Sequence, residues 1–296
     1  GGFEHNQEMR EQYLPRPTDH RWSAGTLENT GDAILEGMRL GAKMHRLDEA
    51  WWCNTISVPG EDIPRLSVME RSYPGSIIVN PAGRRFSNES QNYMAFQIET
   101  FEKHSEENPT YPTWQVFDAN FRATYFVGPL YNSKFRPDWA VPLARYEQEG
   151  FMARADTIRE LAAKIDVDPD GLQDTVDKMN EYARTGVDPD CQRGESAYDR
   201  YYGDPRVTPN PCLGPVEKSP FYAVRIDPGD FGTQGGMVIN ADAQVLHEDG
   251  HAIEGLYAVG NCSAPTLPCY PGPGSTLGPA MTFAYQAAKS ITGYQD

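Results

Sequence analysis

A turn rich in glycine and proline near the end of the sequence constrains the fold more than any other segment. It follows a short apolar stretch at residues 255–261 and runs from Cys269 to Ala280 with the letters CYPGPGSTLGPA. The pattern of residues from about 275 to 291 predicts a helix that starts at this turn. A helix start reached through glycines presents backbone N–H groups and the positive end of the helix dipole. The segment is therefore suited to hold an electron-rich ring or an oxyanion.

The glycines of this turn superficially resemble a dinucleotide fingerprint, but their pattern differs. Gly272, Gly274 and Gly278 are spaced GxGxxxG, and no strand runs directly into them. Taken alone, such a segment is a tight turn. Tyr270 stands directly before it, however, and its phenol and the Gly274 N–H could converge on one carbonyl oxygen as an oxyanion site. The alternative for Tyr270 is a packed aromatic ring with a satisfied hydroxyl.

Composition and charge exclude several function classes. The 296 residues carry a net charge of −16, which disfavours binding to nucleic acid or to an anionic membrane surface. No apolar run is long enough to span a membrane. The five cysteines are odd in number and lack CxxC spacing, which favours free thiols in a reducing cytoplasm. The histidines show no ligand spacing and are interpreted as surface residues, so no metal site is expected; they are His5, His20, His45, His104, His247 and His251.

Hydrophobic periodicity predicts helices and strands along most of the chain. A helix over residues 30–44 would have Thr30 as its N-cap, and two further helices would begin near Asp156 and Asp168, the second ending at Gly186. Residues 104–150 are rich in proline and aromatic residues and are expected to be irregular. The predicted strands lie at residues 76–80, 221–226, 237–240, 244–247 and 256–259.

This order of elements predicts two spatial units. Residues 1–48 and 228–296 would form one α/β domain, and residues 49–227 would form an inserted α+β domain. Ligand sites favour the interfaces between such domains.

Two polar segments are further candidates for a site. Residues 29–32, with the letters NTGD, precede the first predicted helix, and a plain helix cap is the alternative for them. Residues 84–93 follow a predicted strand and place Tyr93 near a domain edge. A solvated loop is the alternative for this second segment.

Taken together, these segments resemble the 3-ketosteroid Δ1-dehydrogenases of the fumarate reductase/succinate dehydrogenase flavoprotein superfamily. The Tyr-Pro-Gly-Pro-Gly turn that starts at Tyr270 is the most specific match. The other matching pieces keep the family's order and are GGFEHNQEMR at residues 1–10, NTGD at 29–32, DEAWW at 48–52, RFSNES at 85–90 with Tyr93, PFYA at 220–223, GDFGTQGG at 229–236 and the stretch 255–261.

The resemblance implies FAD as cofactor and a 1,2-desaturation beside a ketone. Tyr270 and the backbone amide of Gly274 would hold the substrate carbonyl, and Tyr93 would take the α-proton while the neighbouring carbon gives a hydride to flavin N5. Stabilising the growing enolate with preorganised donors makes that proton easier to remove. A tyrosine is a weak base near neutral pH and needs help from a neighbour.

The resemblance also implies the cofactor contacts and the substrate class. The residues expected to touch FAD are Asp32, Gly260, Asn261, Thr276 and Leu277. Fumarate-reducing relatives carry a glutamate where this chain has Asn261, and a substrate-binding histidine where it has Gly232. Both differences favour a small apolar, steroid-like ketone over a dicarboxylate.

The expected fold is the C-terminal part of a Rossmann-like FAD-binding domain with an inserted α+β substrate domain. The family's first half, with the glycine-rich ADP-binding turn and a second tyrosine, has no counterpart in this sequence. A second polypeptide that carries this half is therefore the expected partner; the alternatives are a proteolytic or engineered fragment and a degenerate protein without flavin. A flavin-dependent enone reductase and a non-catalytic subunit that stabilises a flavoprotein partner are the alternative functions.

Overall fold

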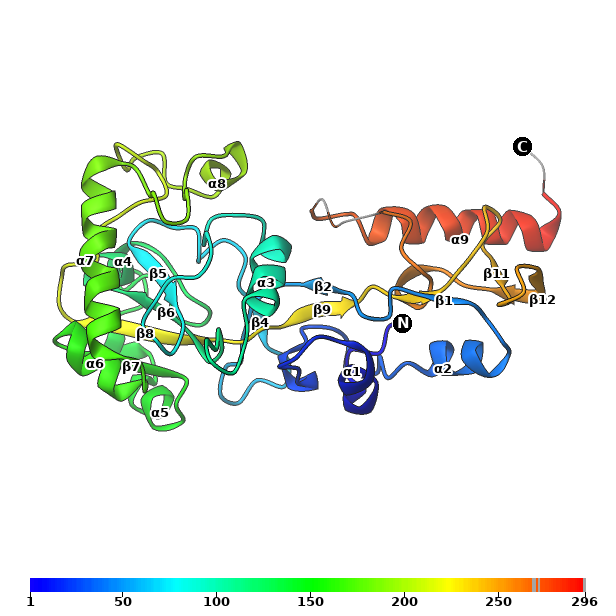
Figure 1. The fold of residues 1–296 in the computed structure, drawn as a ribbon, viewed down its shortest axis with the longest axis horizontal. Helices are drawn as coiled ribbons and strands as arrows, with labels where there is room; N and C mark the ends of the chain where they lie inside the picture. The colour runs from blue at the N-terminus through cyan, green and yellow to red at the C-terminus, as the bar shows by residue number, and fades with distance from the viewer. Residues whose placement is uncertain (268–269, 271, 295–296) are drawn as a thin grey trace. The chain divides into compact units, whose positions relative to one another are not determined.

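A computed structural model of the chain describes residues 1–267, 270 and 272–294. The chain divides into two compact units (Figure 1). The first unit comprises Gly1–Trp52 and Asp230–Asp296, and the second comprises Cys53–Gly229. Cys269 lies outside the described residues, whereas Cys191, Cys212 and Cys262 carry free thiols.

The second unit is built on a four-stranded antiparallel sheet. Its strands are β5 (Ser76–Val79), β6 (Thr113–Phe117), β8 (Phe221–Ile226) and β7 (Met152–Ala155), in that spatial order. The register places Ile77 opposite Val116, and Val116 opposite Ala223. β5 and β6 are buried at every position, because both faces of the sheet are covered. A smaller hairpin consists of β3 (Thr55–Ile56) and β4 (Arg65–Leu66).

Helices α6 (Ile158–Lys164) and α7 (Pro169–Thr185) cover one face of this sheet (Figure 1). Leu161 of α6 and Met179 of α7 are fully buried in the core that they share with Val116. Each helix begins where its capping residue predicts: the Thr157 side chain accepts from the Glu160 N–H, and the Asp168 side chain accepts from the Asp170 N–H. α7 ends at Gly186, whose φ of 79° belongs to the left-handed C-cap.

The expectation of irregular structure over residues 104–150 is wrong. This stretch holds β6 and the helices α4 (Ala119–Thr124), η2 (Asp138–Ala140) and α5 (Leu143–Gln148). Phe121 and Tyr146 pack there with Phe117 and Tyr222 in a second apolar core on the other face of the sheet. The helices are shorter than two turns, so hydrophobic periodicity had too few residues to reveal them.

The remaining helices of the second unit flank its polar segments. α3 (Tyr93–Glu102) follows the segment 84–92, and α8 (Ala197–Tyr201) lies in the loop between α7 and β8. No helix within the described ranges is long and apolar enough to cross a membrane.

The first unit is made of short strand pairs and helices. β1 (Met44–His45) pairs with β10 (Gly236–Met237), and β2 (Ala50–Trp52) pairs with β9 (Asp230–Thr233). α1 (Gln7–Tyr13) carries Arg10, which forms a fully buried ion pair with Asp230 of β9 at 2.8 Å. The 3₁₀ helix η1 (His20–Trp22) leads to Ser23, whose hydroxyl donates to the same carboxylate at 2.6 Å. Segments from the two ends of the chain therefore share one core.

The rest of the first unit holds a hairpin and the last helix. β11 (Gln244–Leu246) and β12 (Ala252–Tyr257) form the hairpin, which is followed by η3 (Gly260–Cys262) and α9 (Leu277–Thr292). The Tyr257 and Ser290 hydroxyls lie 3.2 Å apart and join β12 to α9. α2 (Asp32–Arg39) is shorter than predicted, and Gly31, not Thr30, is its N-cap. Thr30 Oγ1 instead donates to Asp32 Oδ1 at 2.8 Å.

Candidate active site

An aromatic cluster surrounds Tyr270 in the first unit. The Tyr270 ring is buried, with its centroid 5.2 Å from the Trp51 ring of β2 and 5.6 Å from the Phe231 ring of β9. Because β2 and β9 pair with each other, the sheet fixes both neighbouring rings. A phenol held by two rings in this way loses little conformational freedom when it binds a ligand.

The turn after Tyr270 has a backbone that only glycine adopts readily. Gly272 has a φ of 142° and Gly274 a φ of 96°. A Cβ added at either position would meet open space, so it is the backbone conformation and not crowding that requires glycine there. The Ser275 hydroxyl donates to the Gly272 carbonyl at 2.6 Å and closes the turn. α9 then starts at Leu277, and its N-cap residue Thr276 makes no capping hydrogen bond with its side chain. In its first turn the Gly278 N–H donates to the Gly274 carbonyl at 2.8 Å and the Ala280 N–H to the Thr276 carbonyl at 3.2 Å. Pro279 has no N–H, so these three positions do not present the free backbone N–H groups that the sequence predicts for this segment.

A pocket lies between the β12–η3 connection and the start of α9. Three of the predicted cofactor contacts, Gly260, Asn261 and Thr276, line it. Asn261 Oδ1 accepts a hydrogen bond of 3.0 Å from Trp51 Nε1, which fixes the orientation of the amide. The other described residues on the lining are Trp51, Gln234, Ser263, Ala264, Pro265, Thr266, Leu267, Ser275, Pro279, Ala280 and Phe283.

Gln234 carries an unsatisfied amide at this pocket. The residue is 1% exposed, and within the described part of the chain neither its Oε1 nor its Nε2 has a hydrogen-bond partner. A buried amide without partners is costly by about 1–3 kcal/mol. A planar ligand that offers both a donor and an acceptor at its edge, as the flavin ring of FAD does, would satisfy it. The polar chemistry of the lining therefore fits that cofactor. Sequence reasoning did not single out Gln234, since one glutamine carries no pattern.

The other predicted site residues lie elsewhere. Asp32, the first residue of α2, and Leu277, the first residue of α9, are both exposed and are not among the described residues that line the pocket. Tyr93 belongs to the second unit and Tyr270 to the first, so their joint action on one substrate stays a prediction.

Tyr93 is buried at the start of a helix. It is the first residue of α3, and the Asn92 side chain caps this helix by accepting from the Met94 N–H at 2.9 Å. Arg71 fixes the preceding loop by donating to the carbonyls of Glu89 and Gln91 at 2.6 and 2.5 Å. Complete burial lowers the pKa of Arg71. A helix N-terminus favours negative charge, whereas burial of a phenol disfavours it, so a base at this position would need help from its surroundings.

The polar segment 84–93 is not a solvated loop. Arg85 donates to the carboxylates of Glu89 and Asp188, both at 2.7 Å, and Arg193 lies 3.3 Å from Glu89, with all four side chains at most 5% exposed. Desolvation raises the carboxyl pKa of Glu89, but the charges of Arg85 and Arg193 outweigh it and hold the pKa below its ordinary value. Arg85 and Arg193 therefore stabilise the loop before Tyr93.

Fold and pocket define a flavoprotein domain, and comparison with known proteins agrees. The family model described as the FAD binding domain matches residues 1–277, so the chain belongs to this family. The predictions of FAD as cofactor and of a flavoprotein fold with mixed helices and sheets are confirmed at this level.

Individual relatives confirm the resemblance to 3-ketosteroid dehydrogenases. The chain is 45% identical to a 3-oxosteroid 1-dehydrogenase of Mycobacterium tuberculosis H37Rv, over 98% of this chain and 51% of the relative. It is 39% identical to a 4-oxocyclohexanecarboxylate 2-dehydrogenase of Sinomonas cyclohexanicum, over 99% of this chain and 50% of the relative. The crystal structure of 3-ketosteroid delta1-dehydrogenase from Sterolibacterium denitrificans in complex with 1,4-androstadiene-3,17-dione matches with a TM-score of 0.94 at 46% identity, over 100% of this chain and 52% of that one. The chain spans about half the length of these relatives.

Proposed function

We propose that this chain is the catalytic part of an FAD-dependent dehydrogenase that introduces a 1,2 double bond into a 3-ketosteroid or a similar cyclic ketone. The observation that carries the proposal is the match along the whole chain to a solved 3-ketosteroid dehydrogenase that holds a steroid dienone. The first unit would serve the cofactor, and the second unit would supply the substrate domain.

The substrate ketone is assigned to the turn after Tyr270. The Tyr270 phenol and the Gly274 N–H would both donate to the carbonyl oxygen, and they would bind it more strongly as it gains negative charge. The rings of Trp51 and Phe231 support Tyr270 and offer no charged partner for a carboxylate. An apolar cyclic ketone therefore suits this place better than a dicarboxylate.

Tyr93 is assigned as the base. It would accept the α-proton on its phenolate oxygen, leaving an enolate whose oxygen Tyr270 and Gly274 hold. Free tyrosine has a pKa near 10. Tyr93 is the first residue of the ten-residue helix α3, and a helix N-terminus favours negative charge, which supports this role.

The cofactor is assigned to the pocket beside α9. Gly260, Asn261 and Thr276 would contact the flavin ring, and Gln234 would pair with its polar edge. When bound, FAD supplies the acceptor for the hydride that leaves the carbon next to the deprotonated one. Asp32 and Leu277 remain proposed contacts of other parts of the cofactor.

The ADP-binding half is assigned to a second polypeptide. Half of each relative's length has no counterpart in this chain. α9 also exposes an apolar face with Leu277 at 67%, Met281 at 73% and Tyr285 at 53%, which the missing half would cover. The free thiols of Cys191 and Cys212 support a reducing compartment, and we propose the cytoplasm.

An enone reductase is the second candidate function. A probable fumarate reductase of Shewanella frigidimarina is 27% identical over 88% of this chain. The name of that protein describes a reduction, which favours this second candidate. The same residues would then run the reaction in reverse. Anaerobic mixing with a saturated ketone distinguishes the two directions, because only a dehydrogenase transfers electrons from it to the flavin. An assembly that retains no flavin would instead indicate the non-catalytic subunit.

Replacing Tyr270 by phenylalanine tests the proposed function. In the assembled flavoenzyme, we expect Tyr270→Phe to lower kcat for a 3-ketosteroid by about 10²–10³-fold, because one donor to the developing oxyanion is lost. The apolar ring would still pack against Trp51 and Phe231, so flavin content and thermal stability should remain. Unchanged steady-state turnover in this variant would refute the role of Tyr270.

Replacing Gln234 by leucine tests the cofactor assignment. We expect Gln234→Leu to weaken flavin binding by about tenfold, equivalent to roughly 1.4 kcal/mol. The flavin-free protein should be as stable as before or more stable, because a buried unpaired amide is removed. Fluorescence titration of flavin and denaturant unfolding of the apoprotein measure the two effects. Lower apoprotein stability with unchanged flavin affinity would contradict the assignment.

A further inference from the structure

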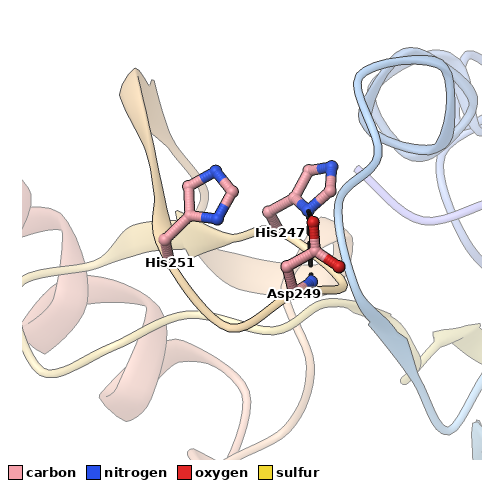
Figure 2. Close-up of side chains that lie close together, drawn as sticks. All are labelled: His247, Asp249 and His251. Atoms are coloured by element: carbon pink, nitrogen blue, oxygen red, sulfur yellow. Dashed lines mark hydrogen bonds and ion pairs between the residues drawn. The ribbon is translucent and has the colours of Figure 1, made fainter.

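The tip of the β11–β12 hairpin gathers two imidazoles and a carboxylate. The ligand atoms of His247, Asp249 and His251 all lie within 4.8 Å of one another (Figure 2). The His247 N–H donates to the His251 carbonyl at 2.8 Å, so the hairpin register brings residues four positions apart face to face. Their rings stack with centroids 4.8 Å apart.

The tip of the hairpin is anchored to residues 41–42 of the same unit. The Glu248 N–H donates to the Gly41 carbonyl at 3.0 Å, and Ala42 pairs with His247 in an isolated bridge. Gly41 has a φ of 77°, and a Cβ there would lie 2.4 Å from His247 Nε2, so the His247 ring packs directly against the backbone. The exposed side of the cluster consists of Asp249 and His251.

The His247 ring nitrogen Nδ1 has two polar neighbours in Asp249. It accepts from the Asp249 N–H at 3.1 Å, and it lies 3.3 Å from the Asp249 Oδ2 (Figure 2). Because a neutral Nδ1 has a single lone pair, a cation shared with Oδ2 would take the place of the hydrogen bond from the Asp249 N–H. Two ligand atoms that each lie about 2.0–2.1 Å from a tetrahedral Zn²⁺ are roughly 3.4 Å apart. This is close to the 3.3 Å between His247 Nδ1 and Asp249 Oδ2.

We propose that this tip binds one divalent late first-row transition ion through His247, Asp249 and His251, with solvent in the remaining position. Two imidazoles and one carboxylate suit Zn²⁺, Ni²⁺ or Cu²⁺ and disfavour Mg²⁺ and Ca²⁺, which prefer oxygen ligands. The ion would join both strands of the hairpin that leads into Gly260 and Asn261. The proposal departs from the expectation of no metal site only at His247 and His251, and it is independent of the dehydrogenase activity.

Zinc titration of the flavoenzyme in chelator-treated buffer tests the proposal. We expect one equivalent of Zn²⁺ to bind, and Asp249→Asn and His251→Ala each to weaken binding by about tenfold or more. Both side chains are exposed, so neither change should disturb folding. Glu248→Gln removes the same charge from the same turn, and His45→Ala removes an exposed histidine from elsewhere in this unit; both should bind as the wild type does.

Cobalt provides a second readout of the same site. Bound Co²⁺ should give the visible spectrum of a nitrogen- and oxygen-ligated ion, which Asp249→Asn and His251→Ala abolish. No stoichiometric zinc binding, equal affinity in all four variants, or a thiolate-to-cobalt charge-transfer band that assigns the ion to cysteine would each overturn the proposal.

Discussion

Phenylalanine in place of Tyr93 should lower kcat for a 3-ketosteroid by about 10²–10⁴-fold in the assembled flavoenzyme, the range that general base catalysis contributes. The loss follows because no other group is assigned to take the α-proton. Tyr93 is buried at the start of α3, and the ring of phenylalanine would keep its packing. Folding and flavin content should therefore remain, which thermal unfolding and the flavin absorbance would check.

A second readout separates the chemical role of Tyr93 from a packing role. Exchange of the substrate's α-hydrogen with solvent should be lost in Tyr93→Phe but retained in Tyr146→Phe, which alters another buried tyrosine of the same unit. Steady-state rates and the exchange rate, followed by NMR in deuterated buffer, measure both effects. If Tyr93→Phe exchanged the hydrogen at the wild-type rate, Tyr93 would not be the base.

Glutamine in place of Glu89 should destabilise the second unit by about 3–5 kcal/mol, because it leaves buried arginine charge without its carboxylate. Glu89 is fully buried between Arg85 and Arg193. Glu61→Gln is the matched control: Glu61 also pairs with an arginine four residues away, at 2.6 Å, but about a third of each side chain is exposed. Denaturant unfolding should show a small effect for Glu61→Gln, and equal losses in both variants would contradict the prediction.

The same network of buried ion pairs predicts that the free energy of unfolding falls in acid. The carboxyl pKa values of Glu89 and Asp188 lie below their ordinary values of 4.5 and 3.8, because Arg85 outweighs the desolvation of both groups. Their contribution is therefore fully present above these ordinary values and is lost as the pH falls through the lower folded values. Unfolding free energies measured between pH 6 and about pH 3 should decline more steeply in the wild type than in Glu89→Gln. A decline of equal steepness in both proteins would count against this role.

Local signals predicted the regular parts of the fold well. α7 begins at the Asp168 cap and ends at Gly186, and β8 spans the predicted residues 221–226, because capping and alternation act within a few residues. The turn between Tyr270 and α9 was also predictable from the sequence, since Gly272 and Gly274 adopt backbone conformations that other residues avoid.

Features that depend on partners distant in sequence were not predictable. The segment 84–93 reads as polar, and a polar segment looks the same whether water or Asp188 and Arg193 satisfy its charges. Gln234 and the pairing of His247 with His251 depend on the pocket and on the hairpin register, which composition does not encode. β6 was missed for a related reason, because a strand covered on both faces shows no alternation.

We propose that the assembled enzyme oxidises a cyclic ketone, with Tyr270 as a donor to its carbonyl and Tyr93 as the base. The most direct test is anaerobic stopped-flow mixing of the flavin-loaded assembly with a 3-ketosteroid that lacks the 1,2 double bond. We predict bleaching of the flavin absorbance and formation of one equivalent of the 1,2-dehydro product, with both slowed in Tyr93→Phe and Tyr270→Phe. A fully flavin-loaded assembly whose absorbance stays unchanged, with no product formed, would contradict the account.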